Sequence, residues 1–589
     1  MDNQFYFLKL RSNIILGGDI DLAEREVKSF FENVKRVSNQ KIVENKIGLS
    51  AQYSTAHSRN NGCIGFLANR TNLTHFDLVR LLNFTQEIWF EKPLDNQSNS
   101  LINNASWAYT VKNGGKDFIC LVPFMACGEL LSQNKITEPK LTDIESLTAF
   151  LSGNKDIKQK TIKAPTNGGT STQHVHSLHK YKAKFFPRLI RSFFVEHLEN
   201  LPRDKSNKVI LLDPFVGSGT ALVEAALLGI DSVGVDIDKL SCTISEAKIN
   251  ALMISPDRIV NSVNVLNTTV ANSSNFQDRF KFPKKIAKKF ERWGALDEQA
   301  EYERIINKWI DAINRIEDNE VKSLLWICLS DALTRKFVIR MMGTGVGRFA
   351  LEIAKTSLDK LMESNLKSLT KSCYTAQILI DAYKISLGQS KVYNGTAINL
   401  PFDSNSFSVI ITSPPYLPAS SGREDYLVGK AISSVALNLM TDDEIESAEK
   451  DSVGSMKWVI EDGDGLPKAV YELHDWLLND PLRKIKAKPI LAYYMSLKQA
   501  LKESYRVLMD NGLALYIIGK ESVFYKFRSR EVLYKVECDK IFANLAMSVG
   551  FKIEEKINVE LDKKNMNARP RSLDSFYETV FILKKSQDR

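Results

Sequence analysis

The chain is poor in cysteine and lacks long apolar runs. Its seven cysteines include no pair at CxxC spacing, so the sequence indicates neither a disulfide framework nor a cysteine-ligated zinc site. No apolar run approaches the ~20 residues that a membrane-spanning helix needs. The first residues also lack a charged and apolar leader. We therefore expect a cytoplasmic protein that does not contact a membrane.

The chain carries only a small excess of positive charge. A net charge of +9 over 589 residues is compatible with a polyanionic partner but does not require one. The hydrophobic fraction of 44% and the charged fraction of 25% are those of an ordinary globular protein. At this length we expect about two to four domains, or one domain that carries large insertions.

One stretch, residues 208–238, reads as a strand, a tight turn, a helix and a second strand. The turn contains Gly217 and Gly219. Glycine at these positions permits a positive φ and lets a ligand approach the backbone, while the start of the following helix offers unpaired amides. Taken alone, the pattern fits an ordinary α/β core as well as a ligand site.

The second strand of this stretch ends at an acid, Asp236, nineteen residues after Gly217. An acid at this place binds a ribose hydroxyl in doubly wound folds. The third glycine of the dinucleotide fingerprint is absent, because residue 222 is Leu. The sequence therefore favours an adenosyl ligand without a pyrophosphate.

A second motif, Ser413-Pro414-Pro415-Tyr416, follows an apolar strand predicted at 408–412. Two consecutive prolines cannot continue the hydrogen bonding of a strand, and they stiffen the turn. The Ser413 hydroxyl, the Pro414 carbonyl and the Tyr416 ring thus become fixed groups, a polar clamp beside a flat ring. A plain turn explains the prolines equally well when the motif is considered by itself.

The remaining sequence divides by composition. An N-terminal helix is expected from Leu22 to about Val34, with Asp21 as its N-cap. A polar, Gly- and Ser-containing stretch has no apolar period and is typical of a linker. The predicted segments are a small N-terminal α+β domain, 1–150; a linker, 151–175; an α/β domain, 176–255 and 391–589; and a helical insertion, 256–390.

Several features give weaker signals. His174, His176 and His179 lack a nearby carboxylate or cysteine to complete a ligand set, so we expect no metal. Basic residues between 281 and 292 could face phosphates, although a solvated helix face is the favoured interpretation. GTGVG at 343–347 follows a helix rather than a strand, and we expect an interhelical loop there. Residues 417–490 read as polar and irregular.

DPFVGSGT, then GVDID, then TSPPY, in this order and each at a strand end, resembles the S-adenosylmethionine-dependent amino-methyltransferases, specifically the cytosine-N4 and adenine-N6 DNA methylases. The resemblance covers about 165–255 and 390–585. It implies S-adenosyl-L-methionine as the cofactor and DNA as the partner. It also makes 176–255 and 391–589 the catalytic domain and the insertion, 256–390, the candidate target-recognition region. It also implies an α/β fold with a Rossmann-like seven-stranded methyltransferase sheet, whose last strands form a hairpin and whose second and third strands flank the helical insertion.

The resemblance also implies roles for individual residues. HKYKAKFFPRL resembles an additional cofactor motif of the family. Ser413 and the Pro414 carbonyl would accept hydrogen bonds from the amino group of the target, and Tyr416 would stack on the base. The implied catalytic residues are Ser413, Pro414, Pro415 and Tyr416, and the implied cofactor-binding residues are Phe185, Pro187, Asp213, Pro214, Phe215, Gly217, Ser218, Gly219, Thr220 and Asp236.

Substrate and base remain open at this point. Serine at 413 leans toward cytosine-N4 rather than adenine-N6 within the family, and a separately encoded restriction endonuclease would be a natural partner. Residues 15–31 resemble the start of tRNA guanine-N2 methyltransferases with a THUMP domain, which makes tRNA an alternative partner. Gly395-Thr396-Ala397 stands where relatives often carry Gly-Asp-Ala, so a noncatalytic nucleic-acid-binding protein is a second alternative.

Overall fold

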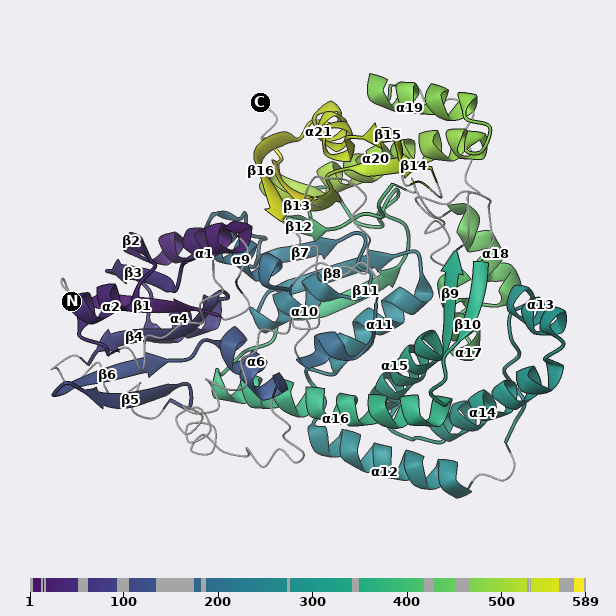
Figure 1. Ribbon diagram of the computed structural model, residues 1–589, viewed down its shortest axis with the longest axis horizontal. Coiled ribbons are helices and arrows are strands. Elements are labelled where there is room, and N and C mark those ends of the chain that lie inside the picture. The colour runs from purple at the N-terminus through teal and green to yellow at the C-terminus, as the bar shows by residue number, and fades with distance from the viewer. Residues whose placement is uncertain are drawn as a thin grey trace.

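The computed structural model contains two large sheets in the part of the chain that it describes, and they lie beside one another (Figure 1). None of the helices in this part is both long and apolar enough to span a bilayer. The structure describes residues 4–11, 14, 17–50, 62–92, 105–133, 174–181, 187–272, 276–341, 349–417, 428–451, 465–526, 529, 531–560 and 577–586.

The N-terminal sheet is antiparallel, with strand order β2-β3-β1-β4-β6-β5. Its strands are β1 Phe5–Leu10, β2 Glu32–Val37, β3 Gly65–Asn69, β4 Thr85–Glu91, β5 Ala108–Asn113 and β6 Lys116–Leu121. Its helices are α1 Gly17–Phe30, α2 Gln40–Ile47, α4 His75–Leu81 and α6 Phe124–Gln133.

The first helix differs from its prediction at both ends. α1 begins at Gly17 and ends at Phe30, so Asp21 lies inside the helix and is not its N-cap. The carboxylate of Asp21 instead accepts a hydrogen bond from Arg36 of β2 at 2.6 Å. Asp21, which the sequence suggested as a helix cap, therefore forms a tertiary ion pair with the strand that follows the helix.

The larger sheet has seven strands in the order β11-β8-β7-β12-β13-β17-β16, and β17 runs antiparallel to both of its neighbours. The pairs between β11, β8, β7, β12 and β13 are parallel. This topology confirms the predicted Rossmann-like seven-stranded sheet and its terminal hairpin. The strands are β7 Ile210–Asp213, β8 Asp231–Asp236, β11 Ser390–Asn394, β12 Phe407–Thr412, β13 Leu508–Gly519, β16 Lys552–Glu560 and β17 Tyr577–Lys584.

Side chains on the central strands alternate between two buried faces. Val409 and Ile411 of β12 belong to the core that continues into the N-terminal sheet, whereas Ile410 belongs to the core under α20 and α21. Leu211 and Leu212 of β7 divide in the same way. Burial on both faces is typical of a parallel sheet covered by helices. These helices are α9 Pro187–His197, α10 Thr220–Leu227, α11 Lys239–Asn250, α20 Ala487–Val507 and α21 Cys538–Ser548.

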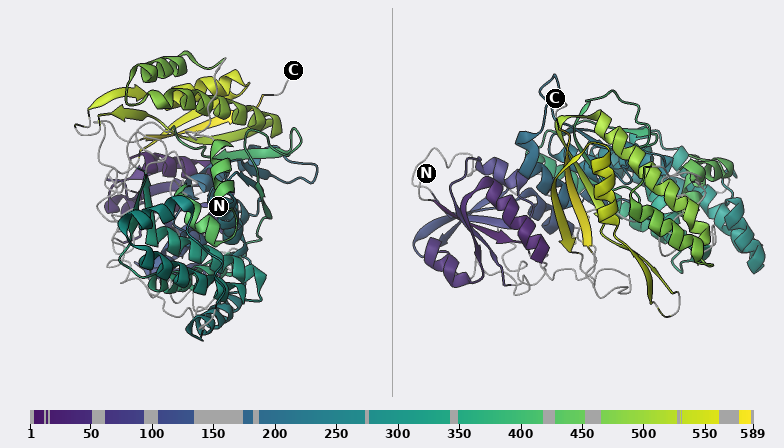
Figure 2. Two further views of the ribbon diagram at one scale, coloured as in Figure 1. Left: turned by 90° about the vertical axis from the view of Figure 1, so that its right-hand side faces the viewer. Right: turned by 90° about the horizontal axis from the view of Figure 1, so that it is seen from above.

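The insertion between β8 and β11 is mainly helical, as predicted, but it also contains a β-hairpin. The predicted interhelical loop at 343–347 lies outside the described residues, and the elements that flank it are strands, not helices. Figure 2 places α13 and α14 at the end of the molecule opposite the N-terminal sheet. The insertion comprises α12 Pro256–Asn272, α13 Lys284–Trp293, α14 Leu296–Asn314, α15 Asn319–Lys336, β9 Phe337–Met341, β10 Phe349–Ile353 and α16 Leu358–Ala382.

The stretch 417–490, expected to be irregular, contains helices wherever the structure describes it at length. Most of the predicted linker, 151–173, lies outside the described residues, and the division into domains stays a prediction. The remaining elements are the short 3-10 helices η1 His174–Ser177, η2 Leu198–Asn200, η3 Val428–Lys430 and η4 Lys484–Lys486, the helices α17 Ala431–Ala436, α18 Asp442–Asp451 and α19 Lys468–Asn479, and the hairpin β14 Ser522–Tyr525 with β15 Val532–Val536.

Candidate active site

The glycine turn between β7 and α10 has the backbone that its sequence requires. Gly217 and Gly219 have φ angles of 51° and 74°, a region that side chains with a Cβ rarely adopt. A Cβ on Gly219 would lie 3.0 Å from the Cβ and Oγ of Ser245 on α11. Glycine at 219 is thus required both by the backbone angle and by the close approach of α11.

Asp213, the last residue of β7, is fully buried beneath this turn. Its Oδ1 accepts hydrogen bonds from the Thr412 hydroxyl at 2.6 Å and from the Phe215 amide at 3.1 Å. Its Oδ2 is buried and has no hydrogen-bond partner among the residues that the structure describes. Burial raises the pKa of Asp213 to about 7, and Asp236 adds to the rise. A buried carboxylate oxygen without a partner calls for a ligand atom, and a cationic group would satisfy it.

Asp236 ends β8 and turns back toward the same glycine turn. Its Oδ2 accepts a hydrogen bond from the Gly217 amide at 2.9 Å, and its Oδ1 accepts one from the Asp238 amide at 3.0 Å. Burial and the nearby Asp238 carboxylate raise its pKa to about 6. The acid predicted to bind a ribose therefore lies directly against the turn predicted to cradle the ligand.

The clamp motif lies at the end of β12, and three of its polar groups are each held by a different strand or helix. The Ser413 hydroxyl donates a hydrogen bond to the carbonyl of Ile517 on β13 at 3.1 Å. The Tyr493 hydroxyl on α20 donates to the carbonyl of Pro415 at 2.9 Å. Tyr416 donates its phenolic proton to Glu578 on β17. Because its proton is used in this way, the Ser413 oxygen keeps its lone pairs for an incoming donor.

The two motifs meet at the carboxyl edge of the sheet. β7 and β12 are adjacent parallel strands, with Leu211 opposite Val409 and Leu212 opposite Ile410. The Thr412 hydroxyl joins the end of β12 to Asp213 at the end of β7. The chain leaves β7 toward β8 on one side, and β12 lies on the other, so this is the switch point at which open α/β sheets bind ligands.

The other predicted cofactor residues are distributed around this edge. Pro214 and Thr220 are buried, and the Ser218 carbonyl accepts a hydrogen bond from Lys248 at 3.1 Å. Phe215 is half-buried against the core under α20. Pro187 opens α9, and Phe185 lies outside the described residues, so their place at a cofactor stays a prediction.

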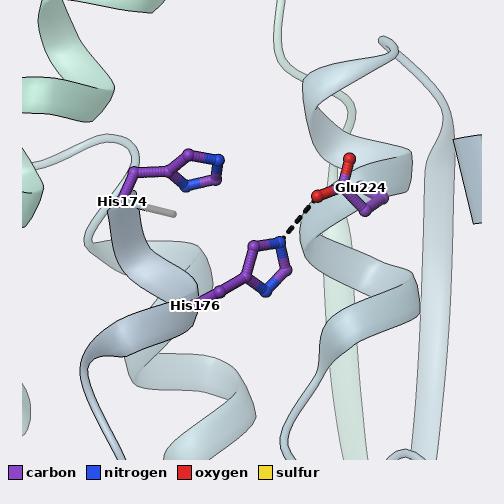
Figure 3. A group of neighbouring side chains, drawn as sticks. All are labelled: His174, His176 and Glu224. Carbon is purple, nitrogen blue, oxygen red and sulfur yellow. Dashed lines mark hydrogen bonds and ion pairs between the residues drawn. The ribbon is translucent and has the colours of Figure 1, made fainter. Parts of the chain in front are cut away.

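The structure supplies a carboxylate that the sequence did not indicate near the histidines. Glu224 comes from α10, and its Oε1 lies 2.6 Å from Nε2 of His176, with His174 beside them (Figure 3). Arg191 donates to the other oxygen of Glu224, and the side chains of all four residues are buried. Arg191 already balances the charge of Glu224, so a dication would add an uncompensated buried double charge. We therefore assign no metal to this group.

The basic cluster in and before α13 is paired in part within the chain. Lys284 lies 3.1 Å from Asp443 and Lys285 lies 3.1 Å from Glu446, both on α18. Lys281 lies 2.7 Å from Asp278 and 3.0 Å from Glu303. These ion pairs favour the solvated helix face over a phosphate-binding face.

Residues of this site that the sequence analysis missed are Tyr181, Asp238, Lys430 and Glu578. Lys430 lies 2.6 Å from Asp238, and Glu578 accepts from Tyr416 at 2.9 Å. Asp238 stands in the GVDID motif, and Tyr181 in the segment HKYKAKFFPRL, so both had a motif signal. Lys430 and Glu578 had none.

Comparisons with known proteins agree with the motifs. The type II methyltransferase M.MjaII of Methanocaldococcus jannaschii is 35% identical over 137 residues, which are 23% of this chain and 24% of the relative. The type II methyltransferase M.MvaI of Kocuria varians is 25% identical over 378 residues, 60% of this chain and 79% of the relative. The chain resembles type II methyltransferases. The resemblance predicted from the motifs is thereby confirmed, and S-adenosyl-L-methionine as cofactor agrees with it.

Other comparisons add less. M.BsoBI of Geobacillus stearothermophilus, also named a type II methyltransferase, is 36% identical over 76 residues, 13% of this chain and 14% of the relative. No protein-family model matches the chain. TrmN from Thermus thermophilus overlays with a TM-score of 0.27 at 9% identity, covering 99% of both chains. An overlap this weak carries no argument about function.

Proposed function

We propose that this protein is an S-adenosylmethionine-dependent DNA methyltransferase that modifies an exocyclic amino group, with cytosine-N4 preferred over adenine-N6. The observation that carries the proposal is the hydrogen bond between Thr412 and Asp213, which brings the glycine turn and the serine clamp together at one edge of the sheet. The relatives named type II methyltransferases support DNA as the substrate.

The cofactor side of the site fits an adenosyl sulfonium that carries an ammonium group. Oδ2 of Asp213 would accept from a cationic group, and the carboxylate of Asp236 would bind ribose hydroxyls. The positive φ angles at Gly217 and Gly219 let a ligand approach the backbone. When bound, S-adenosyl-L-methionine supplies an electrophilic methyl group on sulfur.

The target side of the site would orient an amino group. Ser413 and the Pro414 carbonyl would each accept one of its protons, which favours a pyramidal nitrogen with its lone pair exposed. An aryl amine is a weak nucleophile because its lone pair is delocalised into the ring, so this reshaping and the alignment of the reacting atoms carry the catalysis. The in-line displacement then needs no strong base before attack, and a proton leaves the nitrogen afterwards.

A base inside a duplex cannot reach this clamp and must leave the helical stack. Extrusion costs roughly a few kcal/mol. Stacking on the Tyr416 ring would offset this cost by about 1–3 kcal/mol per base. Hydrogen bonds to the edge of the base would contribute further stabilisation. The tether from Tyr416 to Glu578 keeps the ring in one orientation for this purpose.

The proposal is tested by incubating the purified chain with methyl-labelled cofactor and either plasmid DNA or bulk tRNA. We expect label in DNA. Label in tRNA alone would support the tRNA guanine-N2 alternative instead, and label in neither would support a noncatalytic nucleic-acid-binding protein. A separately encoded restriction endonuclease and a cytoplasmic location stay predictions.

A further inference from the structure

Lys430 ends η3, in the segment of chain that follows the serine clamp. Its ammonium donates hydrogen bonds to Oδ2 of Asp238 at 2.6 Å and to the hydroxyls of Tyr181 and Ser241 at 3.0 Å each. These partners come from two other parts of the chain, the region before α9 and the start of α11. A single half-buried cation therefore joins three segments that are far apart in sequence.

The partners of Lys430 all lie on the cofactor side of the site. Asp238 is the N-cap of α11 and donates its amide to Asp236, the predicted ribose ligand. The ring of Tyr181 lies 3.5 Å from the position that a Cβ on Gly217 would occupy. The ammonium lies 4.4 Å from the centroid of the same ring, within the range of a cation–π contact.

The charges around this point explain why a lysine is needed. Asp213 and Asp238 are buried acids, and the half-buried Asp236 interacts electrostatically with each of them. The thiol of Cys242 lies beside the backbone carbonyl of Asp236. Burial alone would raise the pKa of Asp238, but Lys430 and the hydroxyl of Ser241 outweigh it and leave that pKa lowered. Without the cation, the adjacent carboxylates of Asp236 and Asp238 would repel each other and would take up protons at higher pH.

We propose that Lys430 is a positioning residue for the cofactor, which holds Tyr181 against the glycine turn and keeps Asp236 and Asp238 arranged for ligand binding. The inference rests on the proposed methyltransferase function. Lys430 does not contact the serine clamp through any hydrogen bond that the described residues show. Its loss should therefore weaken cofactor binding and leave the handling of the target base largely intact.

The test compares Lys430→Met with Lys239→Met. Lys239 is a neighbouring, exposed lysine that pairs with Glu444 at 4.0 Å, so it is a matched control for the loss of one positive charge. We expect calorimetric titration with S-adenosylmethionine to show a Kd raised by about tenfold or more in Lys430→Met, because the buried carboxylate of Asp238 loses its cation. The Kd of Lys239→Met should stay within about twofold of the parent.

A split between kinetic parameters separates this role from a general loss of structure. At saturating cofactor, the kcat of Lys430→Met on plasmid DNA should stay within about threefold of the parent, since the clamp is untouched. The ratio of the cofactor Kd of Lys430→Met to that of the parent should increase as the pH falls from about 8 to 6. Without the lysine, Asp236 and Asp238 take up protons more readily over this range. Lys430→Arg should restore much of the affinity.

Should Lys430→Met fail to fold, Tyr181→Phe provides the second variant. It removes one hydroxyl partner of Lys430 and keeps the ring, so we expect a rise of about two- to fivefold in cofactor Kd. An unchanged Kd in both variants, or a loss of kcat with an unchanged Kd, would overturn the inference. If the parent protein neither binds the cofactor nor labels DNA, the proposed function fails instead, and the two failures are distinguishable.

Discussion

The hydroxyl of Tyr416 donates a hydrogen bond to Oε1 of Glu578 over 2.9 Å, although the two residues are 162 positions apart in sequence. Glu578 lies on β17, next to β13, and Gly519 of β13 faces the Tyr416 ring with no side chain between them. Burial raises the pKa of Glu578, while the hydrogen bond from Tyr416 opposes that rise. The Tyr416 ring, which is predicted to stack on the target base, is thus anchored through its hydroxyl to Glu578, a residue that no sequence motif indicates.

Removing this tether should impair turnover without abolishing it. In Tyr416→Phe the ring remains but one hydrogen bond is lost, so we expect kcat on DNA to fall about three- to tenfold. In Tyr416→Ala, which removes the stacking surface, kcat on DNA should fall by about a hundredfold or more. Tyr393→Phe, at an exposed position on β11, is the control and should behave as the parent does. Equal kcat for Tyr416→Phe and the parent would show that the tether does not position the ring.

Cofactor affinity should depend on pH through Asp213 and Asp236, whose pKa values are raised to about 7 and about 6. For an acid with a raised pKa, the stability contribution is full at low pH and is lost as the pH rises through the folded-state value. The ligand-free protein should therefore lose stability through these groups as the pH rises from about 4, near their unfolded-state pKa, to about 7. A cationic ligand binds the ionised form, so its affinity should rise about tenfold from pH 6 to 8.

Calorimetry in buffers of different ionisation enthalpy checks this expectation, because cofactor binding near pH 6.5 should release protons. Asp213→Asn should flatten the pH dependence. An affinity that is constant over this pH range in the parent protein would mean that neither acid meets a cationic group of the ligand.

The two glycines of the turn should differ in their tolerance of alanine. Both have a positive φ, which costs about 1–2 kcal/mol for a residue with a Cβ. In Gly219→Ala the new Cβ would also lie 3.0 Å from Ser245, whereas in Gly217→Ala it would meet Tyr181 at an ordinary 3.5 Å. Urea unfolding should therefore show the larger loss of stability for Gly219→Ala. The reverse order would contradict the close packing of α11 on the turn.

The buried group around Glu224 should be a strong determinant of stability. Arg191 donates to Glu224 on α10 and to the Arg80 carbonyl of α4, and its guanidinium lies 4.6 Å from the centroid of Phe124. Arg191→Met leaves the carboxylate buried without its cation, which should reduce the free energy of unfolding by about 3–5 kcal/mol. Arg304→Met, which breaks an exposed pair with Glu301, should cost less than about 0.5 kcal/mol in the same urea titration. Similar losses in both variants would contradict this account.

The serine of the clamp should act on the chemical step. Ser413→Ala removes one proposed acceptor for the target amino group, so we expect kcat to fall by about a hundredfold or more while the cofactor Kd changes by less than about twofold. Single-turnover kinetics measures the rate of the chemical step, and calorimetry on the same preparation measures the cofactor Kd. An equal loss of both would show that Ser413 belongs to the cofactor side of the site.

The strands that carry the motifs could be predicted because their signals are local. The apolar runs before Asp213 and Ser413 correspond to β7 and β12, and the glycines adopt the angles that their spacing suggested. The two motifs are far apart in sequence, but they could still be predicted to form one site. Parallel strands of one sheet present their carboxyl ends at the same edge.

Side chains whose partners are distant in sequence could not be predicted in the same way. Asp21 looked like a helix cap, yet it pairs with Arg36 on the next strand. The histidine pair seemed to lack a carboxylate because Glu224 is supplied by a helix 48 residues further on. Lys430 stands in a stretch that reads as irregular, and only the fold brings it to Asp238. Tertiary packing, which no local pattern records, decides these pairs.

Nucleoside analysis of the methylated DNA identifies the base and the atom that receive the methyl group. Plasmid DNA treated with the protein and labelled cofactor would be digested to nucleosides and separated by liquid chromatography with mass detection. We expect label in N4-methylcytosine. Label in N6-methyladenine would contradict the choice of base, and label on carbon, as 5-methylcytosine, would contradict the amino-group chemistry assigned to Ser413 and Tyr416.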